Sequence, residues 1–147
     1  MNVASPVVST IGYQGRSIED FIAALTAAAV NVVVDVRSKP ISRRHEYSKK
    51  RLQEALESSG FTYWHVPELG MPIELLPQRS PKDGNVQILE AYRDRISDTS
   101  EALDQLEIDA RHQHICLLCY EADPHHCHRG VIAEHLETEG QLEVRHL

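Results

Sequence analysis

The stretch Asn31–Val36, with the sequence NVVVDV, decides the fold class. Its apolar residues follow one another almost without interruption, which is typical of a strand in a parallel sheet covered on both faces. A second run of this kind, ICLLCY at Ile115–Tyr120, lies far along the chain. We expect the two runs to be adjacent or nearly adjacent central strands of one sheet.

The residues before Asn31 predict a strand and a helix. Val7–Tyr13, VVSTIGY, is rich in β-branched residues and is typical of a strand. Ser17 and Asp20 form a capping-box-like start for a helix that runs to about Ala29. The order up to Val36 is therefore strand, helix, strand.

The rest of the chain continues this alternation. The predicted elements are a helix at Lys49–Ser59, a strand at Phe61–Val66, helices at Asn85–Ile96 and Ser100–Arg111, a helix from Asp123-Pro124 to about Gly140, and an edge strand at Leu142–Leu147. This pattern predicts an α/β fold: a single three-layer domain over residues 1–147, with a mostly parallel central sheet flanked by helices.

One connection stands apart from these elements. Residues 67–84 contain four prolines, at positions 67, 72, 77 and 81. A loop of this length in a compact domain is usually a lid, a binding loop or disordered. We expect this proline-rich loop to be the least regular internal segment and to act as a lid or binding loop.

Composition limits the class of protein. The chain has 147 residues, of which 41% are hydrophobic and 25% are charged, as in ordinary globular domains. It has no apolar run of eighteen residues and no secretory signal pattern, so neither a membrane span nor secretion is expected. Three cysteines, an odd number, suggest free thiols and a cytoplasmic location.

Basic residues are concentrated in one segment. From Arg37 to Arg51 there are seven basic residues against one acid, Glu46, which gives this basic segment a net charge of +6. The whole chain carries −7, so the remainder carries −13. We expect a local anion site and little nonspecific binding of nucleic acid.

Three segments follow predicted strands and carry the unexplained polar residues. Ligands of open parallel sheets bind at the carboxyl ends of the strands, where loops and helix N-termini meet. This rule selects Thr10–Gly15, Asp35–Arg44 and Cys119–Arg129. We expect the functional residues of the three segments to converge.

Short motifs in these segments resemble a known family. They are Thr10-Ile-Gly-Tyr13, Asp35-Val-Arg37 with Pro40 and Ser42-Arg43, Tyr63, Leu69-Gly70, Leu118-Cys-Tyr-Glu121, Asp123-Pro124 and Cys127-His-Arg129. From about Thr10 to Leu136, the chain resembles the family catalogued as domain of unknown function 488. Members often have a second glycine directly after Leu-Gly, where this chain has Met71. They also often have a Phe before the serine that follows Ser-Arg, where this chain has Tyr47. The resemblance implies no activity.

The cysteines differ in their predicted roles. Cys116 is most simply a core thiol, whereas Cys119, at a strand end, fits a core role and a site role equally well. The Asp123-Pro124 signal places Cys127 one turn inside a helix, near Arg129. The helix dipole and the guanidinium predict a lowered pKa and a nucleophilic thiolate for Cys127. The alternative is a small buried spacer.

Arginines are the candidate anion ligands. Arg37 and Arg43, three residues either side of Pro40, can converge on one anion, and Ser42 is grouped with them. Arg129 either joins this site or forms a structural ion pair with Glu121 or Asp35.

The other candidate residues handle protons or position the ligand. Glu121 or His128 is expected to transfer protons, and Tyr13 to offer a ring for stacking. Asp35 is expected to orient a neighbouring arginine.

Metal and cofactor binding are not predicted. Cys116-x-x-Cys119 with Cys127 and His128 resembles a zinc spacing, but residues three apart on a strand point to opposite faces. The chain has neither a Walker loop nor G-x-G-x-x-G, so no nucleotide cofactor is indicated.

The leading hypothesis is a small cytoplasmic enzyme acting on an anionic, phosphate-bearing substrate, such as a nucleotide or nucleic-acid end. Arg37, Arg43 and Arg129 would bind the anion, and the thiolate of Cys127 or Cys119 would be the nucleophile. Two alternatives stay open. One is a noncatalytic nucleic-acid-binding module, and the other is a thiol redox or sulfur-handling protein.

Overall fold

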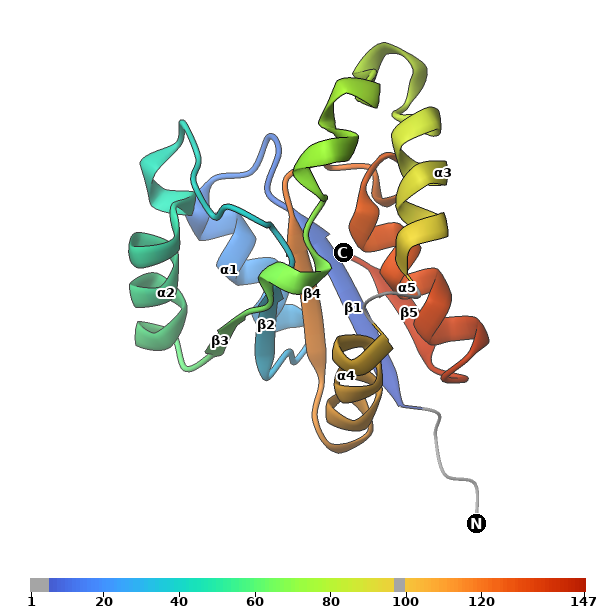
Figure 1. Ribbon diagram of the computed structural model, residues 1–147. Coiled ribbons are helices and arrows are strands. Elements are labelled where there is room, and N and C mark those ends of the chain that lie inside the picture. Colours follow the sequence, from blue (N-terminus) through green and yellow to red (C-terminus); the bar gives the residue numbers. More distant parts are fainter. Residues whose placement is uncertain (1–5, 97–99) are drawn as a thin grey trace.

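A five-stranded, all-parallel sheet forms the centre of the molecule (Figure 1). The computed structural model describes residues 6–96 and 100–147. The strands are β1 (Val7–Gly12), β2 (Val32–Asp35), β3 (Thr62–His65), β4 (Ile115–Cys119) and β5 (Glu143–His146), in the order β3-β2-β4-β1-β5. The predicted α/β class is confirmed, and the two apolar runs are adjacent, with β4 in the centre of the sheet.

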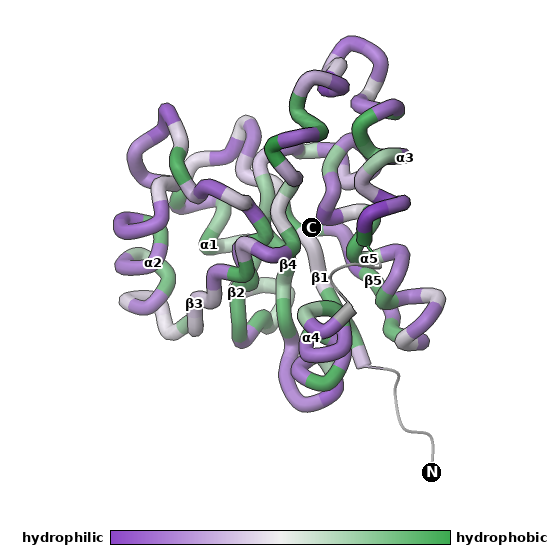
Figure 2. Tube along the Cα trace, viewed as in Figure 1, coloured by the Kyte–Doolittle hydropathy of each residue, from purple (hydrophilic) through white to green (hydrophobic). Residues whose placement is uncertain are grey.

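Helices cover both faces of the sheet. On one side lie α1 (Ile18–Ala27) and α2 (Lys49–Ser58), and on the other lie α3 (Val86–Arg95), α4 (Ser100–His112) and α5 (His128–Thr138). Figure 2 shows hydrophobic residues along β2 and β4 and hydrophilic ones over the outer surface of α2. This is the predicted three-layer arrangement. None of the helices described in residues 6–96 and 100–147 is long and apolar enough to cross a membrane.

Side-chain alternation along β4 divides its residues between the two cores. Ile115, Leu117 and Cys119 belong to the core beneath α3, α4 and α5, whereas Cys116 and Leu118 belong to the core beneath α1 and α2. Cys116 is fully buried, which confirms the predicted core thiol.

The start of α5 differs from the prediction. Pro124–His126 form one 3-10 turn, in which the Asp123 side chain accepts a hydrogen bond from His125 N. The chain then becomes extended at Cys127, and the α-helix begins at His128. Asp123-Pro124 therefore starts a short turn, and Cys127 is the N-cap of α5 and not part of its first turns.

The proline-rich loop, residues 67–84, contains three short 3-10 helices, Pro67–Leu69, Ile73–Gln78 and Pro81–Asp83. It is attached to the core by the buried Leu69 and Leu75 and by a hydrogen bond of 2.7 Å from Tyr92 Oη to Leu69 O. Ile73 and Leu76 are exposed. The loop is irregular but anchored, and its role as a lid stays a prediction.

The sheet order determines where a ligand site can form. β4 lies between β1 and β2, yet α5, which follows β4, covers the opposite face from α1 and α2, which follow β1 and β2. Connections that diverge to opposite faces leave a crevice at the carboxyl ends of the strands. The crevice at β4 is where the predicted site segments meet.

Candidate functional site

A pocket of about 290 Å³ occupies this crevice. Residues that follow β1, β2 and β4 line it, together with the proline-rich loop and the start of α3; among them are Tyr13, Arg37, Met71, Leu76, Arg79, Asn85, Cys119, Tyr120, Glu121, His126, Cys127 and His128. A larger groove of about 970 Å³ runs along the edge strand β3 between α2 and α4. We place the candidate site in the smaller pocket, because the predicted cysteines and His128 line it and do not line the groove.

Close packing holds the turn after β4 against the turn after β1. A side chain at Gly12 would overlap the carbonyl oxygen of Glu121, so only glycine fits there. That carbonyl accepts a hydrogen bond of 2.6 Å from Arg129 Nη1, and Ala122 O accepts one of 3.3 Å from Nη2. Arg129 is fully buried, and its Nε has no partner in the described part of the chain. Its partners are main-chain carbonyls and not the carboxylates of Glu121 or Asp35.

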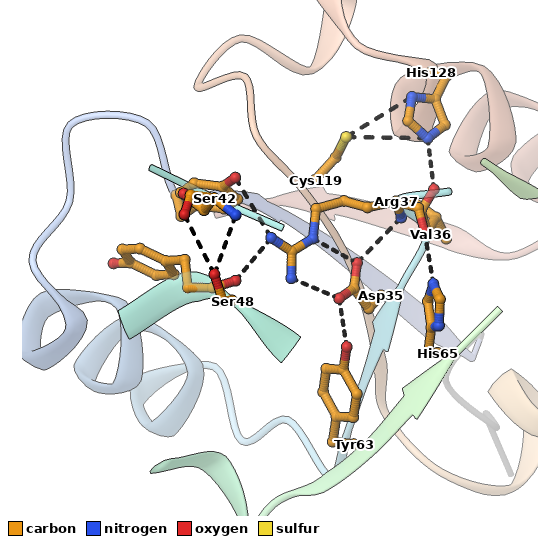
Figure 3. Close-up of polar contacts among 11 residues, drawn as sticks. Asp35, Val36, Arg37, Ser42, Ser48, Tyr63, His65, Cys119 and His128 are labelled. Carbon is orange, nitrogen blue, oxygen red and sulfur yellow. Dashed lines mark hydrogen bonds and ion pairs between the residues drawn. The ribbon is translucent and has the colours of Figure 1, made fainter. Parts of the chain in front are cut away.

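Asp35 and Arg37 form a buried network with Tyr63 (Figure 3). Arg37 donates to both carboxylate oxygens of Asp35, from Nε at 2.9 Å and from Nη2 at 2.7 Å. Tyr63 Oη donates to Asp35 at 2.5 Å, and Arg37 Nη1 donates to Tyr47 O at 2.8 Å. Asp35 thus orients Arg37, which lines the pocket with its charge already paired.

The electrostatics of this network follow from its burial. Burial by itself lowers the pKa of Arg37, but the hydrogen bonds and the charge of Asp35 raise it to a larger extent. Burial and the negative charge of Asp35 both raise the pKa of Tyr63. Arg37 therefore stays charged and Tyr63 stays a donor at any physiological pH.

The remaining basic segment does not converge on Arg37. Arg43 is exposed, lines no part of the pocket, and makes no polar contact within residues 6–96 and 100–147. Ser42 shapes the turn, because its Oγ accepts from Arg44 N at 3.1 Å. Arg44 pairs with Glu46 and lies over the Tyr47 ring.

Tyr13 stacks within the protein. Its ring centroid lies 4.4 Å from that of Tyr47, at an interplanar angle of 15°. The ring is therefore occupied on one face by a residue of its own chain.

Cys119, Cys127 and His128 form a cluster at the inner end of the pocket. Their Sγ atoms and a ring nitrogen all lie within 4.8 Å of one another. Cys119 Sγ is 3.8 Å from His128 Nδ1 and 3.8 Å from Glu121 Oε2. His128 Nε2 lies 2.8 Å from Val36 O, which accepts its proton (Figure 3). In the neutral ring this bond leaves Nδ1 unprotonated, and Cys119 Sγ lies at nearly the same distance from the two ring nitrogens, 3.8 Å from Nδ1 and 4.0 Å from Nε2.

The predicted lowering of the Cys127 pKa is wrong. Cys127 is buried, and burial raises the pKa of its thiol well above the ordinary value, with the neighbouring Cys119 adding to the rise. The N-cap position places the thiol near the positive end of the helix dipole. However, the free-energy cost of desolvating a thiolate is larger than the stabilisation that the dipole provides. Burial alone would lower the pKa of His128, yet its contacts with Cys127 and Val36 raise it.

Among the pocket residues that sequence reasoning missed are Arg79 and Asn85. Arg79, on the proline-rich loop, is exposed and lines the pocket; its backbone N–H donates to Leu76 O, but its guanidinium has no hydrogen bond or ion pair to any described residue. Asn85 ties this loop to the turn before α5, because its Nδ2 donates to His126 O at 3.0 Å. The signal for Arg79 was a lone arginine in a loop predicted to be a lid or a binding loop.

Comparison with known protein families identifies the family of this chain. The model of the family described as "Domain of unknown function DUF488" matches residues 17–136. The chain belongs to this family. No curated protein and no solved structure matches the chain.

The DUF488 match covers most of the candidate site. Cys119, Cys127, His128 and the Asp35–Arg37 pair all lie inside residues 17–136, whereas β1 and Tyr13 lie before them. The cysteine and histidine cluster is therefore part of the DUF488 domain itself. Its thiols and imidazole are a donor set that suits either thiolate chemistry or a soft metal ion.

Proposed function

We propose that the chain is a small enzyme that acts on an anionic, phosphate-bearing substrate in this pocket, with Cys119 as its nucleophile. The observation that carries the proposal is the position of Cys119. It is the thiol that lies between the His128 ring and the Glu121 carboxylate at the wall of the pocket. A nucleophile beside a base that a third group orients is the recurring arrangement of covalent catalysis.

Each neighbour has a role in this proposal. His128 Nδ1 accepts the thiol proton, and Val36 O holds the ring by accepting from Nε2. Glu121, at 3.8 Å from the sulfur, transfers a proton to or from the substrate. These roles go to Cys119 in preference to Cys127, because Cys119 Sγ lies 3.8 Å from both Glu121 Oε2 and His128 Nδ1, whereas burial raises the pKa of the Cys127 thiol well above its ordinary value.

The mouth of the pocket combines a positive charge with apolar side chains, which suits a substrate that has both a phosphate group and a ring. Arg79 supplies a guanidinium that is unpaired among the described residues and that matches a phosphate. Ile41, Leu76 and Tyr120 are exposed apolar side chains that line the same pocket. A nucleotide has both chemical parts.

The first test is alkylation of metal-free, reduced protein by iodoacetamide at neutral pH, read by mass spectrometry. We expect Cys119 to react first, while Cys116 and Cys127 react only on unfolding because burial raises the pKa of both thiols. Cys119→Ser should remove the fast phase, and Cys116→Ala is the matched control that should keep it. Fast labelling of Cys127, or no labelling of folded protein at all, would refute the assignment of Cys119.

The second test compares two exposed arginines in calorimetric titrations with inorganic phosphate and with a nucleoside monophosphate. We expect Arg79→Ala to weaken binding about 10- to 100-fold, as lost hydrogen bonds to a charged group do. Arg43→Ala should change affinity little, because Arg43 does not line the pocket. A larger loss in Arg43→Ala would instead favour the anion site predicted from the basic segment.

A further inference from the structure

We propose that Cys119, Cys127 and His128 also form a binding site for one Zn²⁺ ion. Their three ligand atoms lie within 4.8 Å of one another. Zinc bound to sulfur at about 2.3 Å and to nitrogen at about 2.0–2.1 Å in a tetrahedron needs ligand pairs roughly 3.5–3.8 Å apart. The distance from Cys119 Sγ to His128 Nδ1 is already 3.8 Å. Side-chain movements of about 1 Å would complete the geometry.

The surroundings of His128 are those of a metal ligand. A histidine that binds metal usually donates its other ring N–H to a carboxylate or a main-chain carbonyl, which fixes the ring. Here Nε2 donates to Val36 O at 2.8 Å. With the proton on Nε2, the lone pair of Nδ1, which lies 3.8 Å from Cys119 Sγ, is available to an ion.

The donor set selects the kind of ion. Two thiolates and one imidazole favour Zn²⁺ over Mg²⁺ and Ca²⁺, which prefer oxygen ligands. Cys116, the third cysteine, packs in the core beneath α1 and α2 and is not a donor. The zinc spacing apparent in Cys116-x-x-Cys119 is therefore not the one used; Cys127 supplies the second sulfur.

The site has three ligands from the protein and one open position. All three ligand residues line the pocket, so the fourth position is directed toward it. Closed structural zinc sites have four protein ligands, whereas an open site admits water or a small molecule. The expected site is therefore reachable from solvent, and the ion can exchange.

This inference rests on the proposed function in one respect, because Cys119 serves both. A sulfur bound to zinc is not free to attack a substrate. The zinc-bound protein is therefore the inhibited form, and removal of the ion restores the Cys119 nucleophile.

The test uses the reduced full chain, stripped with a chelator and titrated with Co²⁺ without oxygen. We expect one equivalent to produce a thiolate-to-cobalt charge-transfer band and the visible bands of tetrahedral Co²⁺, and Zn²⁺ to abolish both. One equivalent of Zn²⁺ should slow alkylation of Cys119 at least about tenfold, and chelator should restore it. Cys119→Ser, Cys127→Ser and His128→Gln should each lose the charge-transfer band or shift it and weaken binding.

Two controls separate the possible failures. Cys116→Ala should bind Co²⁺ as the unaltered chain does, and circular dichroism identifies any variant that does not fold. Absence of the charge-transfer band in folded, reduced protein of unaltered sequence overturns the zinc site, whatever the variants do. Cys119 that resists alkylation in the metal-free protein overturns the proposed function instead, and leaves the cobalt result to stand by itself.

Discussion

Asp35→Ala is expected to lower the free energy of unfolding by about 3–5 kcal/mol, because it leaves a buried arginine without its counter-ion. Asp35 is fully buried and Arg37 is 6% exposed, and the Asp35 carboxylate accepts two hydrogen bonds from the Arg37 guanidinium and one from its backbone N–H. The substitution also removes the acceptor of Tyr63 Oη. Urea unfolding followed by circular dichroism measures the loss.

Two variants calibrate this result. Tyr63→Phe removes one hydrogen bond to the same carboxylate and should cost less, about 1.5–3 kcal/mol. The double variant Asp35→Leu with Arg37→Met removes both charges and should recover much of the stability, since replacing a whole buried pair is often tolerated. A loss below about 1 kcal/mol in Asp35→Ala would show that the Arg37 charge is satisfied from the pocket, and would make Arg37 an anion ligand after all.

Arg129→Ala is expected to destabilise the protein by about 3–5 kcal/mol, as the loss of a large buried side chain does. The substitution removes the donors to Glu121 O and Ala122 O and opens a cavity beneath the turn that carries Glu121. Because that turn also positions Cys119 relative to Glu121, the rate of Cys119 alkylation should change with stability. Thermal unfolding and timed labelling measure the two effects.

Arg129→Met and Arg51→Ala are the matched controls for this prediction. Methionine preserves most of the buried volume, so Arg129→Met should be less destabilising than alanine. Arg51 is exposed on α2 and should change stability by no more than about 0.5 kcal/mol. A phosphate-binding defect in Arg129→Ala without loss of stability would contradict the structural role and return Arg129 to the anion site.

Side-chain patterns along the chain were enough to predict the layers of the fold. NVVVDV and ICLLCY are apolar on both faces, which is typical of strands inside a parallel sheet covered by helices. Ser17 was a correct helix signal because an N-cap is a local interaction: its Oγ accepts from Asp20 N at 3.1 Å. The opposite orientations of Cys116 and Cys119 also followed from strand geometry alone.

Tertiary structure decided what each polar residue does. Asp123-Pro124 predicted the start of the last helix, but it caps only a 3-10 turn, and the α-helix begins at His128. The burial of the Cys127 thiol depends on tertiary packing, and this burial decides whether its pKa rises or falls. Arg37 pairs with the Asp35 carboxylate, and Arg129 donates to the carbonyl of Glu121; both contacts form only in the folded chain. The same holds for Arg79, which the proline-rich loop brings to the pocket. Local sequence patterns determine the path of the backbone, whereas the charge state and reactivity of a side chain depend on neighbours that are distant in sequence.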